Sequence, residues 1–187
     1  MEKINLKNIY RYEKKNDLYN IDISLDSYDD LFDEWVFAPF TKREFDSDLI
    51  DFIEQSFMEI PYKSKIDINF YLPAKIRDEN IENRIFRTFK NNIKFRLLKF
   101  NNERFRFLKS SSIYAIIGFT FIIISNLIEN NIKVSLIKDI LAQGILIGAW
   151  VLTWNLFSTI FFKLRDLNYK IKIYKKLLNS KIYFYNY

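Results

Sequence analysis

IYAIIGFTFIIISNLI at residues 113–128 and ILAQGILIGAWVLTWNLFSTIFF at residues 140–162 are the two apolar runs that decide how this chain folds. Neither run contains a charged residue. A helix rises about 1.5 Å per residue, so roughly 20 apolar residues cross the hydrocarbon core of a bilayer. The sequence therefore predicts a transmembrane helical hairpin over residues 110–162, with spans at 112–128 and 140–162.

Small residues on these runs predict close helix packing. All three glycines of the chain lie here, at Gly118, Gly144 and Gly148, whereas glycine in soluble proteins occurs mainly in turns. On a helical wheel Gly144 and Gly148 share a face with Asn155, and two glycines four residues apart let helix backbones approach closely. We expect Gly118, Gly144, Gly148 and Asn155 to be helix-packing residues, which either join the two spans of one chain or join subunits into a homo-oligomer.

The distribution of charge predicts the orientation of the hairpin. Residues 1–60 carry 7 Lys and Arg against 15 Asp and Glu, a net charge of −8, whereas residues 61–187 carry 22 against 8, a net charge of +14. Basic residues flank the hairpin on both sides: Lys90, Lys94, Arg96, Lys99, Arg104, Arg106 and Lys109 before it, and Lys163, Arg165, Lys170, Lys172, Lys175, Lys176 and Lys181 after it. Segments beside a span are basic on the cytoplasmic side. We expect a multi-pass protein of the cell (inner or plasma) membrane with cytoplasmic N- and C-termini.

The composition excludes several kinds of active site. The chain has no cysteine and no histidine, which excludes disulfides, thiolate nucleophiles, Ser-His-Asp triads and nearly every zinc or haem site. Carboxylates such as Asp22, Asp26 and Asp67 are the remaining acid-base groups, and they more often form the solvated face of a sheet. We therefore predict that the chain is not an enzyme and has no catalytic residue, metal or cofactor.

Residues 1–109 predict a small cytoplasmic α+β domain that ends in a basic amphipathic helix. Alternating apolar residues at 19–25 and 66–72 are typical of strands, and residues 46–59 show helical spacing with Asp46 or Ser47 as the N-cap. Strand, helix, strand in this order favours a parallel βαβ crossover. An aromatic cluster is predicted to cover one end of the core: Trp35, Phe37, Pro39 and Phe40.

The segments on either side of the hairpin also predict helices. Asp78 is the predicted N-cap of a long amphipathic helix with a continuous apolar stripe from Ile81 to Phe100. Asn101 and Asn102 are poor helix formers and predict a kink or short break before the first span. Residues 163–187 predict a basic cytoplasmic helix and a C-terminal strand, KIYFYNY, which would return to the sheet.

This order of elements resembles a group of small uncharacterised prokaryotic two-span membrane proteins with an N-terminal cytoplasmic α+β domain. EWVFAPFTKREFDSDLIDFI at residues 34–53 contains the group's Trp-x-x-x-Pro stretch at Trp35 and Pro39. AQGILIGAWVLTW at residues 142–154 is similar to its Gly-Trp stretch and second Trp: Gly148, Trp150 and Trp154. Members often have charged residues and a proline after the second Trp, where this chain has Asn155, Leu156 and Ser158. The resemblance therefore implies a two-span membrane protein, but no intramembrane ion pair and no activity.

We interpret the chain as an integral membrane protein of the interaction or sensor/effector kind, which oligomerises through its hairpin or is simply anchored by it. Its expected partners are the lipid bilayer, further copies of itself, and a cytoplasmic protein or small ligand. Two alternatives remain open. One is a membrane-surface enzyme that uses Asp or Glu, and the other is a membrane protein that binds nucleic acid through residues 90–109, with a steep dependence on salt.

Overall fold

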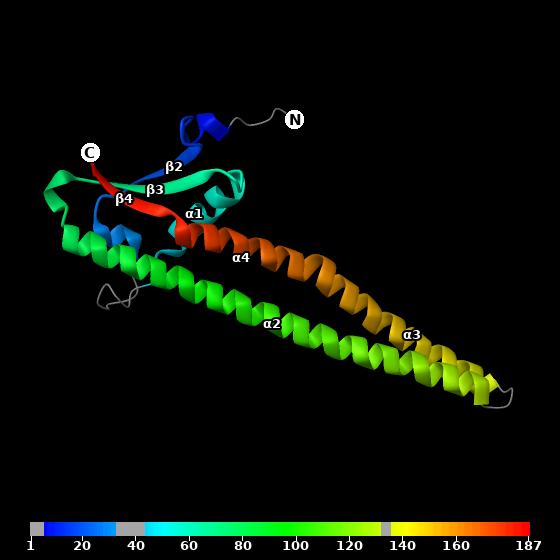
Figure 1. The fold of residues 1–187 in the computed structure, drawn as a ribbon. Helices are drawn as coiled ribbons and strands as arrows, with labels where there is room; N and C mark the ends of the chain where they lie inside the picture. The colour runs from blue at the N-terminus through cyan, green and yellow to red at the C-terminus, as the bar shows by residue number, and fades with distance from the viewer. Residues whose placement is uncertain (1–5, 33–43, 132–135) are drawn as a thin grey trace. The chain divides into compact units, whose positions relative to one another are not determined.

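The computed structural model describes residues 6–32, 44–131 and 136–187 (Figure 1). The chain divides into two compact units. We call Met1–Leu98 with Ile171–Tyr187 the sheet unit, and Lys99–Lys170 the helical unit. The predicted mixed α+β fold is confirmed. The C-terminal segment belongs to the same unit as the N-terminal domain, because its strand completes that domain's sheet.

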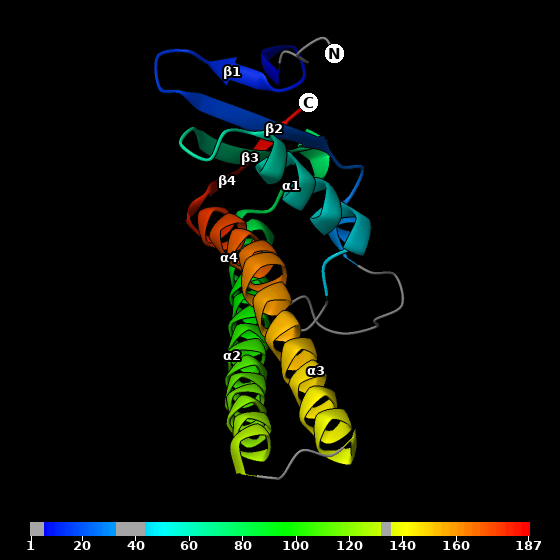
Figure 2. The same ribbon diagram turned by 90° about the vertical axis from the view of Figure 1, so that its right-hand side faces the viewer.

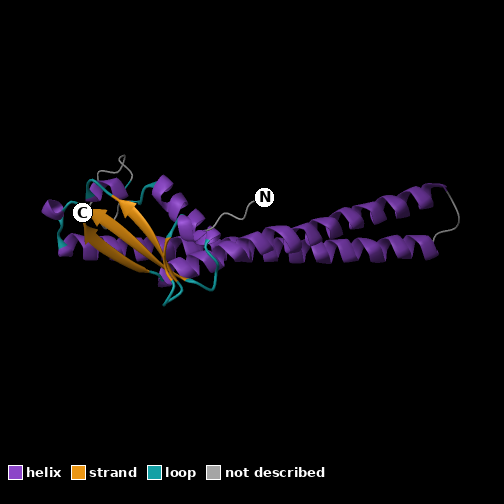
Figure 3. Ribbon diagram, turned by 90° about the horizontal axis from the view of Figure 1, so that it is seen from above, coloured by secondary structure: helices purple, strands orange, loops and turns teal. Residues whose placement is uncertain are grey.

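In the described part of the sheet unit, four strands form one mixed sheet in the order β1-β2-β3-β4 (Figures 2 and 3). They are β1 (Arg11–Glu13), β2 (Leu18–Ser24), β3 (Lys65–Leu72) and β4 (Lys181–Asn186). β1 is antiparallel to β2, whereas β2 and β3, and β3 and β4, are parallel. The predicted strands β2 and β3 and the return of the C-terminal strand to the sheet are confirmed.

Helix α1 (Ser47–Glu59) makes the crossover between β2 and β3. It begins after Asp46, whose carboxylate accepts the backbone N–H of Leu49 at 2.9 Å, and this bond satisfies one of the free donors at a helix start. Of the two predicted N-caps, Asp46 is therefore confirmed, and Ser47 is the first residue of the helix. The predicted cluster of Trp35, Phe37, Pro39 and Phe40 lies outside the described residues.

Helix α2 (Glu79–Asn131) runs through the predicted interruption. The short break expected at Asn101 and Asn102 was wrong, because both residues lie inside continuous helix, whereas the alternative of a kink there stays a prediction. An asparagine costs a helix only about 0.7 kcal/mol or less relative to alanine. Extending a helix that has already formed adds one hydrogen bond for each residue. This gain offsets the helix-propensity cost of two asparagines.

The core of the sheet unit lies between one face of the sheet and three helices. The third of these is α4 (Leu164–Asn179), whose residues from 171 onward belong to this unit. Phe45 meets Phe89 of α2 edge to face, with 5.3 Å between ring centroids. The sheet and each of these helices contribute buried residues to the core, among them Ile21, Ile68, Phe70, Ile53, Phe57, Phe89, Ile93 and Leu177.

A partly buried hydrogen-bond network joins the start of α2 to the end of β4. Arg77 donates to both carboxylate oxygens of Glu82, at 2.7 and 2.9 Å, and to Oδ1 of Asn186 at the end of β4, at 2.9 Å. The hydroxyl of Tyr28 donates to Oε1 of Glu82 at 3.0 Å. Burial raises the pKa of Tyr28, so this hydroxyl remains a donor.

The helical unit contains the rest of α2 packed against α3 (Leu136–Ser158). Gly118 lies beside Ala149, and the hydroxyl of Ser125 donates to the carbonyl of Ala142 at 2.9 Å. Residue numbers fall along α3 as they rise along α2, so the two helices are antiparallel. Five residues of π-helix, Thr159–Lys163, follow α3 before α4 begins.

Two helices in the described part of the chain are long and apolar enough to cross a membrane, Glu79–Asn130 and Leu136–Asn179. In the most apolar stretch of each, only 17% and 11% of the residues are buried. A soluble core helix of this composition would be mostly buried. The apolar surface of these helices therefore faces outward.

Candidate functional site

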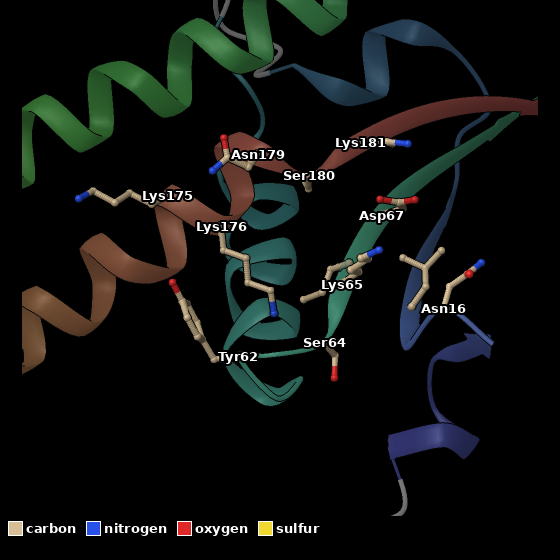
Figure 4. Close-up of a pocket in the computed structure, with 12 residues that line it drawn as sticks. Asn16, Tyr62, Ser64, Lys65, Asp67, Lys175, Lys176, Asn179, Ser180 and Lys181 are labelled. Atoms are coloured by element: carbon tan, nitrogen blue, oxygen red, sulfur yellow. The ribbon is translucent and has the colours of Figure 1, made fainter. Parts of the chain in front are cut away.

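A pocket of about 700 Å³ opens at the edge of the sheet unit where β3 and β4 begin. These strands are parallel, and Asp67 near the start of β3 lies opposite Lys181 at the start of β4. The last turn of α4 precedes β4 directly and supplies a further wall (Figure 4). The pocket thus collects side chains from segments that are more than 100 residues apart in the sequence.

The described residues that line the pocket are strongly basic. Four are lysines, namely Lys65 on β3, Lys175 and Lys176 on α4, and Lys181 on β4, whereas Asp67 is the acid among them. None of the four lysines forms an ion pair with another residue in the part of the chain that the structure describes. The lining side chains therefore carry more positive than negative charge, although Asp17 and Glu13 lie close enough for their charges to act on Lys176 and Asp67.

Lys176 is the most enclosed of these lysines, and its side chain points from α4 toward Tyr62 and Lys65 (Figure 4). Its Nζ donates to the carbonyl of Pro61 at 3.1 Å and lies over the rings of Tyr62 and Phe57, at 5.6 and 6.0 Å from their centroids. Burial lowers the pKa of Lys176, although the charge of Asp17 partly opposes this. Its ammonium group is thus held by a carbonyl and aromatic rings while it is partly removed from water.

Asp67 weakens the positive charge of the pocket only in part. Burial and, to a smaller extent, the charge of Glu13 raise the pKa of Asp67, whereas a hydrogen bond from the backbone of Lys181 and the charges of Lys181 and Lys65 act to lower it. The net direction is upward. Since burial disfavours the charged form of a carboxyl group, Asp67 is a poorer counter-ion here than an exposed aspartate would be.

Lys90 of α2 fixes the end of α4 that carries two of the pocket lysines. Its Nζ donates to the carbonyls of Leu178 and Ser180 at 2.5 and 2.6 Å, and to that of Leu177 at 3.5 Å. The last carbonyls of a helix have no partner within the helix, so a lysine is well suited to cap them. Burial lowers the pKa of Lys90. This cap positions the wall of the pocket without being part of its lining.

The face of the sheet opposite the core carries a polar network. Oδ1 of Asp22 accepts from Nδ2 of Asn69 at 2.8 Å and from Nη2 of Arg11 at 3.0 Å, and Asn69 also donates to Oδ1 of Asn20 at 3.0 Å. Tyr71 and Tyr185 stack beside it: their ring centroids are 5.4 Å apart. Asp22, a carboxylate considered for acid-base chemistry, is therefore engaged in the hydrogen bonds of the sheet.

The four predicted helix-packing residues fall into two pairs. A Cβ added at Gly118 would lie 3.5 Å from Cβ of Leu152, and one added at Gly148 would lie 3.3 Å from the ring of Phe121, so both glycines lie where α2 meets α3. A Cβ added at Gly144 would meet no described atom within 4 Å. Asn155 is exposed, and its Nδ2 donates to the carbonyl of Val151 in its own helix at 3.2 Å.

The sequence did not reveal the lysine pocket. The interpretation of the charges assigned Lys175, Lys176 and Lys181 to membrane topology and gave Lys65 no role. One signal was present, because Lys65 and Lys181 both stand at the start of a predicted strand. Among the described residues no group of three or more His, Cys, Asp or Glu side chains could hold a metal ion.

Comparisons with protein families, with curated proteins and with solved structures found no match for this chain. The resemblance to small two-span membrane proteins therefore stays a hypothesis.

Proposed function

We propose that this chain is an integral membrane protein in which two transmembrane helices anchor a cytoplasmic binding module, the sheet unit. The observation that carries the proposal is the outward apolar surface of the helical unit. Phe119 is 66% exposed, Ile147 is 64% exposed and Trp154 is 72% exposed, and all three lie in runs without charge. A soluble protein rarely exposes such a continuous apolar surface, whereas hydrocarbon accommodates it.

Polar side chains within the apolar runs support the same proposal. The hydroxyls of Thr120 and Thr153 donate to the carbonyls of Ile116 and Ala149, at 2.9 and 2.8 Å, one turn earlier in their own helices. Ser125 donates across to α3. A polar group without a partner costs several kcal/mol in hydrocarbon. These hydroxyls are therefore compatible with lipid on the outside.

Charge supports the proposed orientation. Fourteen lysines and arginines lie in the segments that flank the hairpin, Lys90 to Lys109 and Lys163 to Lys181. Both flanks would then lie on the cytoplasmic side, where basic residues gather and anionic lipid headgroups attract them. The sheet unit, built from the sequence before and after the hairpin, would be cytoplasmic as well.

Fractionation of cells that express the chain tests the anchor. We expect the protein to stay in the membrane pellet through washes with high salt and then with alkaline carbonate, because buried apolar spans are insensitive to both. Release by carbonate would contradict insertion. Release by high salt alone would favour the electrostatic alternative, in which lysines and arginines hold the chain on a polyanion.

A second function, self-association, is favoured by the outer face of α3. Gly144 and Asn155 lie three turns apart on this face, outside the contact with α2. An exposed amide in hydrocarbon gains by bonding to a neighbouring helix, typically by about 1 kcal/mol or less. We propose that copies of the chain meet along this face.

The two glycines of α3 give a matched test of that idea. We expect Gly144→Leu to lower the mass of the particle in mild detergent and to leave the melting temperature of the chain unchanged. Gly148→Leu should lower the melting temperature and leave the particle mass unchanged, since its added side chain would collide with Phe121 of the same chain. Multi-angle light scattering and a thermal melt measure the two quantities. An unaltered particle mass for Gly144→Leu would show that this face meets lipid only.

A further inference from the structure

We propose that the lysine pocket at the start of β3 and β4 binds the phosphate groups of an anionic ligand. The inference rests on the proposed function in one respect, since it names the ligand class of the proposed binding module. It draws on charge, pocket size and the sources of the lining side chains, all of which lie within the sheet unit.

The lysines of the pocket have no carboxylate at ion-pair distance in the described chain, so Asp67 and Asp17 offset their mutual repulsion only in part. Lys65, Lys176 and Lys181 come from three separate elements, and within the described chain none of them has a carboxylate within ion-pair distance. Like charges gathered in one pocket repel each other. The attraction of the lysines to an anion placed between them outweighs that repulsion. Phosphate offers several acceptor oxygens, so it can accept from ammonium groups on different walls at once.

The usual explanation for basic residues at such a place, the helix dipole, does not account for all four lysines of the pocket. Lysines in the last turn of a helix interact favourably with the helix dipole, which accounts for Lys175 and Lys176 near the end of α4. Lys181 follows the end of α4 by two residues and so also lies near the negative end of that dipole, whereas Lys65 lies at the start of β3 and is left without this explanation. Their convergence follows from the parallel pairing of β3 with β4.

The remainder of the lining suits a small anionic molecule. A volume of about 700 Å³ lies within the range of small-ligand pockets, roughly 300 to 1,000 Å³. Tyr62, which is largely exposed, presents a ring on which an attached planar group can stack. The partly desolvated ammonium of Lys176 would gain from an anion, because burial has already removed much of its water.

Titration of inorganic pyrophosphate into the full-length protein in neutral detergent tests the proposal. We expect measurable binding to the parent, and an affinity that is lower by about a hundredfold in the Lys65→Gln/Lys181→Gln variant, since each of the two charged hydrogen bonds is worth about tenfold. Asp67→Asn should raise the affinity, because it removes the acid that repels phosphate. Lys172→Gln is the matched control: Lys172 is exposed on α4 but does not line the pocket, and its loss should change affinity by less than about twofold.

Two results would overturn the proposal. One is the absence of pyrophosphate binding to the parent protein at millimolar concentration, and the other is an equal loss of affinity in Lys172→Gln and in the pocket variant. The titration uses solubilised protein. A negative titration would therefore refute the phosphate site, whereas release from washed membranes would refute the membrane anchor. The two exposed strand lysines are chosen so that folding survives, and a thermal melt of each variant verifies this.

A second arm separates the two sources of phosphate, a lipid headgroup and a soluble ligand. The parent and the Lys65→Gln/Lys181→Gln variant are melted in nanodiscs of phosphatidylcholine, with and without phosphatidylglycerol. Stabilisation of the parent alone by phosphatidylglycerol assigns the pocket to a lipid headgroup. An equal response of both proteins, together with pyrophosphate binding to the parent, assigns it to a soluble ligand.

Discussion

Replacing Phe119 and Ile147 with arginine in one variant is expected to remove the chain from the carbonate-washed membrane pellet. Both side chains point outward and lie well inside their apolar runs. An arginine near the middle of a span costs about 2.5–3.5 kcal/mol on insertion scales, so the pair shifts the insertion equilibrium by roughly a thousandfold or more. Immunoblots of pellet and supernatant measure the effect.

The matched control places the same two changes outside the runs. Phe95 and Leu98 are also large, exposed apolar residues, but they lie on the part of α2 that belongs to the sheet unit. Phe95→Arg/Leu98→Arg should stay in the pellet like the parent. If the Phe119→Arg/Ile147→Arg variant were retained equally well, its outer surface would face water, and the transmembrane assignment would be wrong.

Lys90→Met is expected to lower the melting temperature of the sheet unit by roughly 10 °C, from a loss of about 2–3 kcal/mol. The methionine keeps the apolar stem but removes the donor that caps the carbonyls of Leu178 and Ser180. Ser180 is buried, so its carbonyl has little access to water as a substitute partner. Circular dichroism of the detergent-solubilised protein during heating gives the measurement.

Arginine at the same position provides the comparison for this cap. Lys90→Arg retains several donors and should lose less than half as much stability as Lys90→Met. A melting curve for Lys90→Met that overlays the parent would mean that the end of α4 is fixed by packing alone. The wall of the lysine pocket would then have no dependence on Lys90.

Elements with a regular apolar period were predictable from the sequence. β2, β3 and α1 each bury one face, and the burial follows from alternation or from helical spacing that is visible without the fold. β1 lacks this signal: Arg11–Glu13 is three residues long, and none of them is fully buried. Only its pairing with β2 makes it a strand.

Features that depend on tertiary contacts were not predictable. The lysine pocket arises because β4 pairs with β3 in parallel, which brings Lys181 next to a residue more than 100 positions earlier. The short break expected at Asn101 and Asn102 was wrong, because helix propensity is a weak prior inside a long helix. Gly144 and Gly148 share one face on a helical wheel, yet only Gly148 meets the neighbouring helix.

Cysteine labelling tests the central claim, that the hairpin crosses the membrane and leaves both termini in the cytoplasm. The chain contains no cysteine, so each single-cysteine variant reports one position. In intact cells a membrane-impermeant maleimide should label Asn131→Cys, between the spans, and should label Asn16→Cys and Asn186→Cys only after permeabilisation. Labelling of the two terminal positions in intact cells, with Asn131→Cys protected, would contradict the orientation. Labelling of all three in intact cells would contradict the crossing itself.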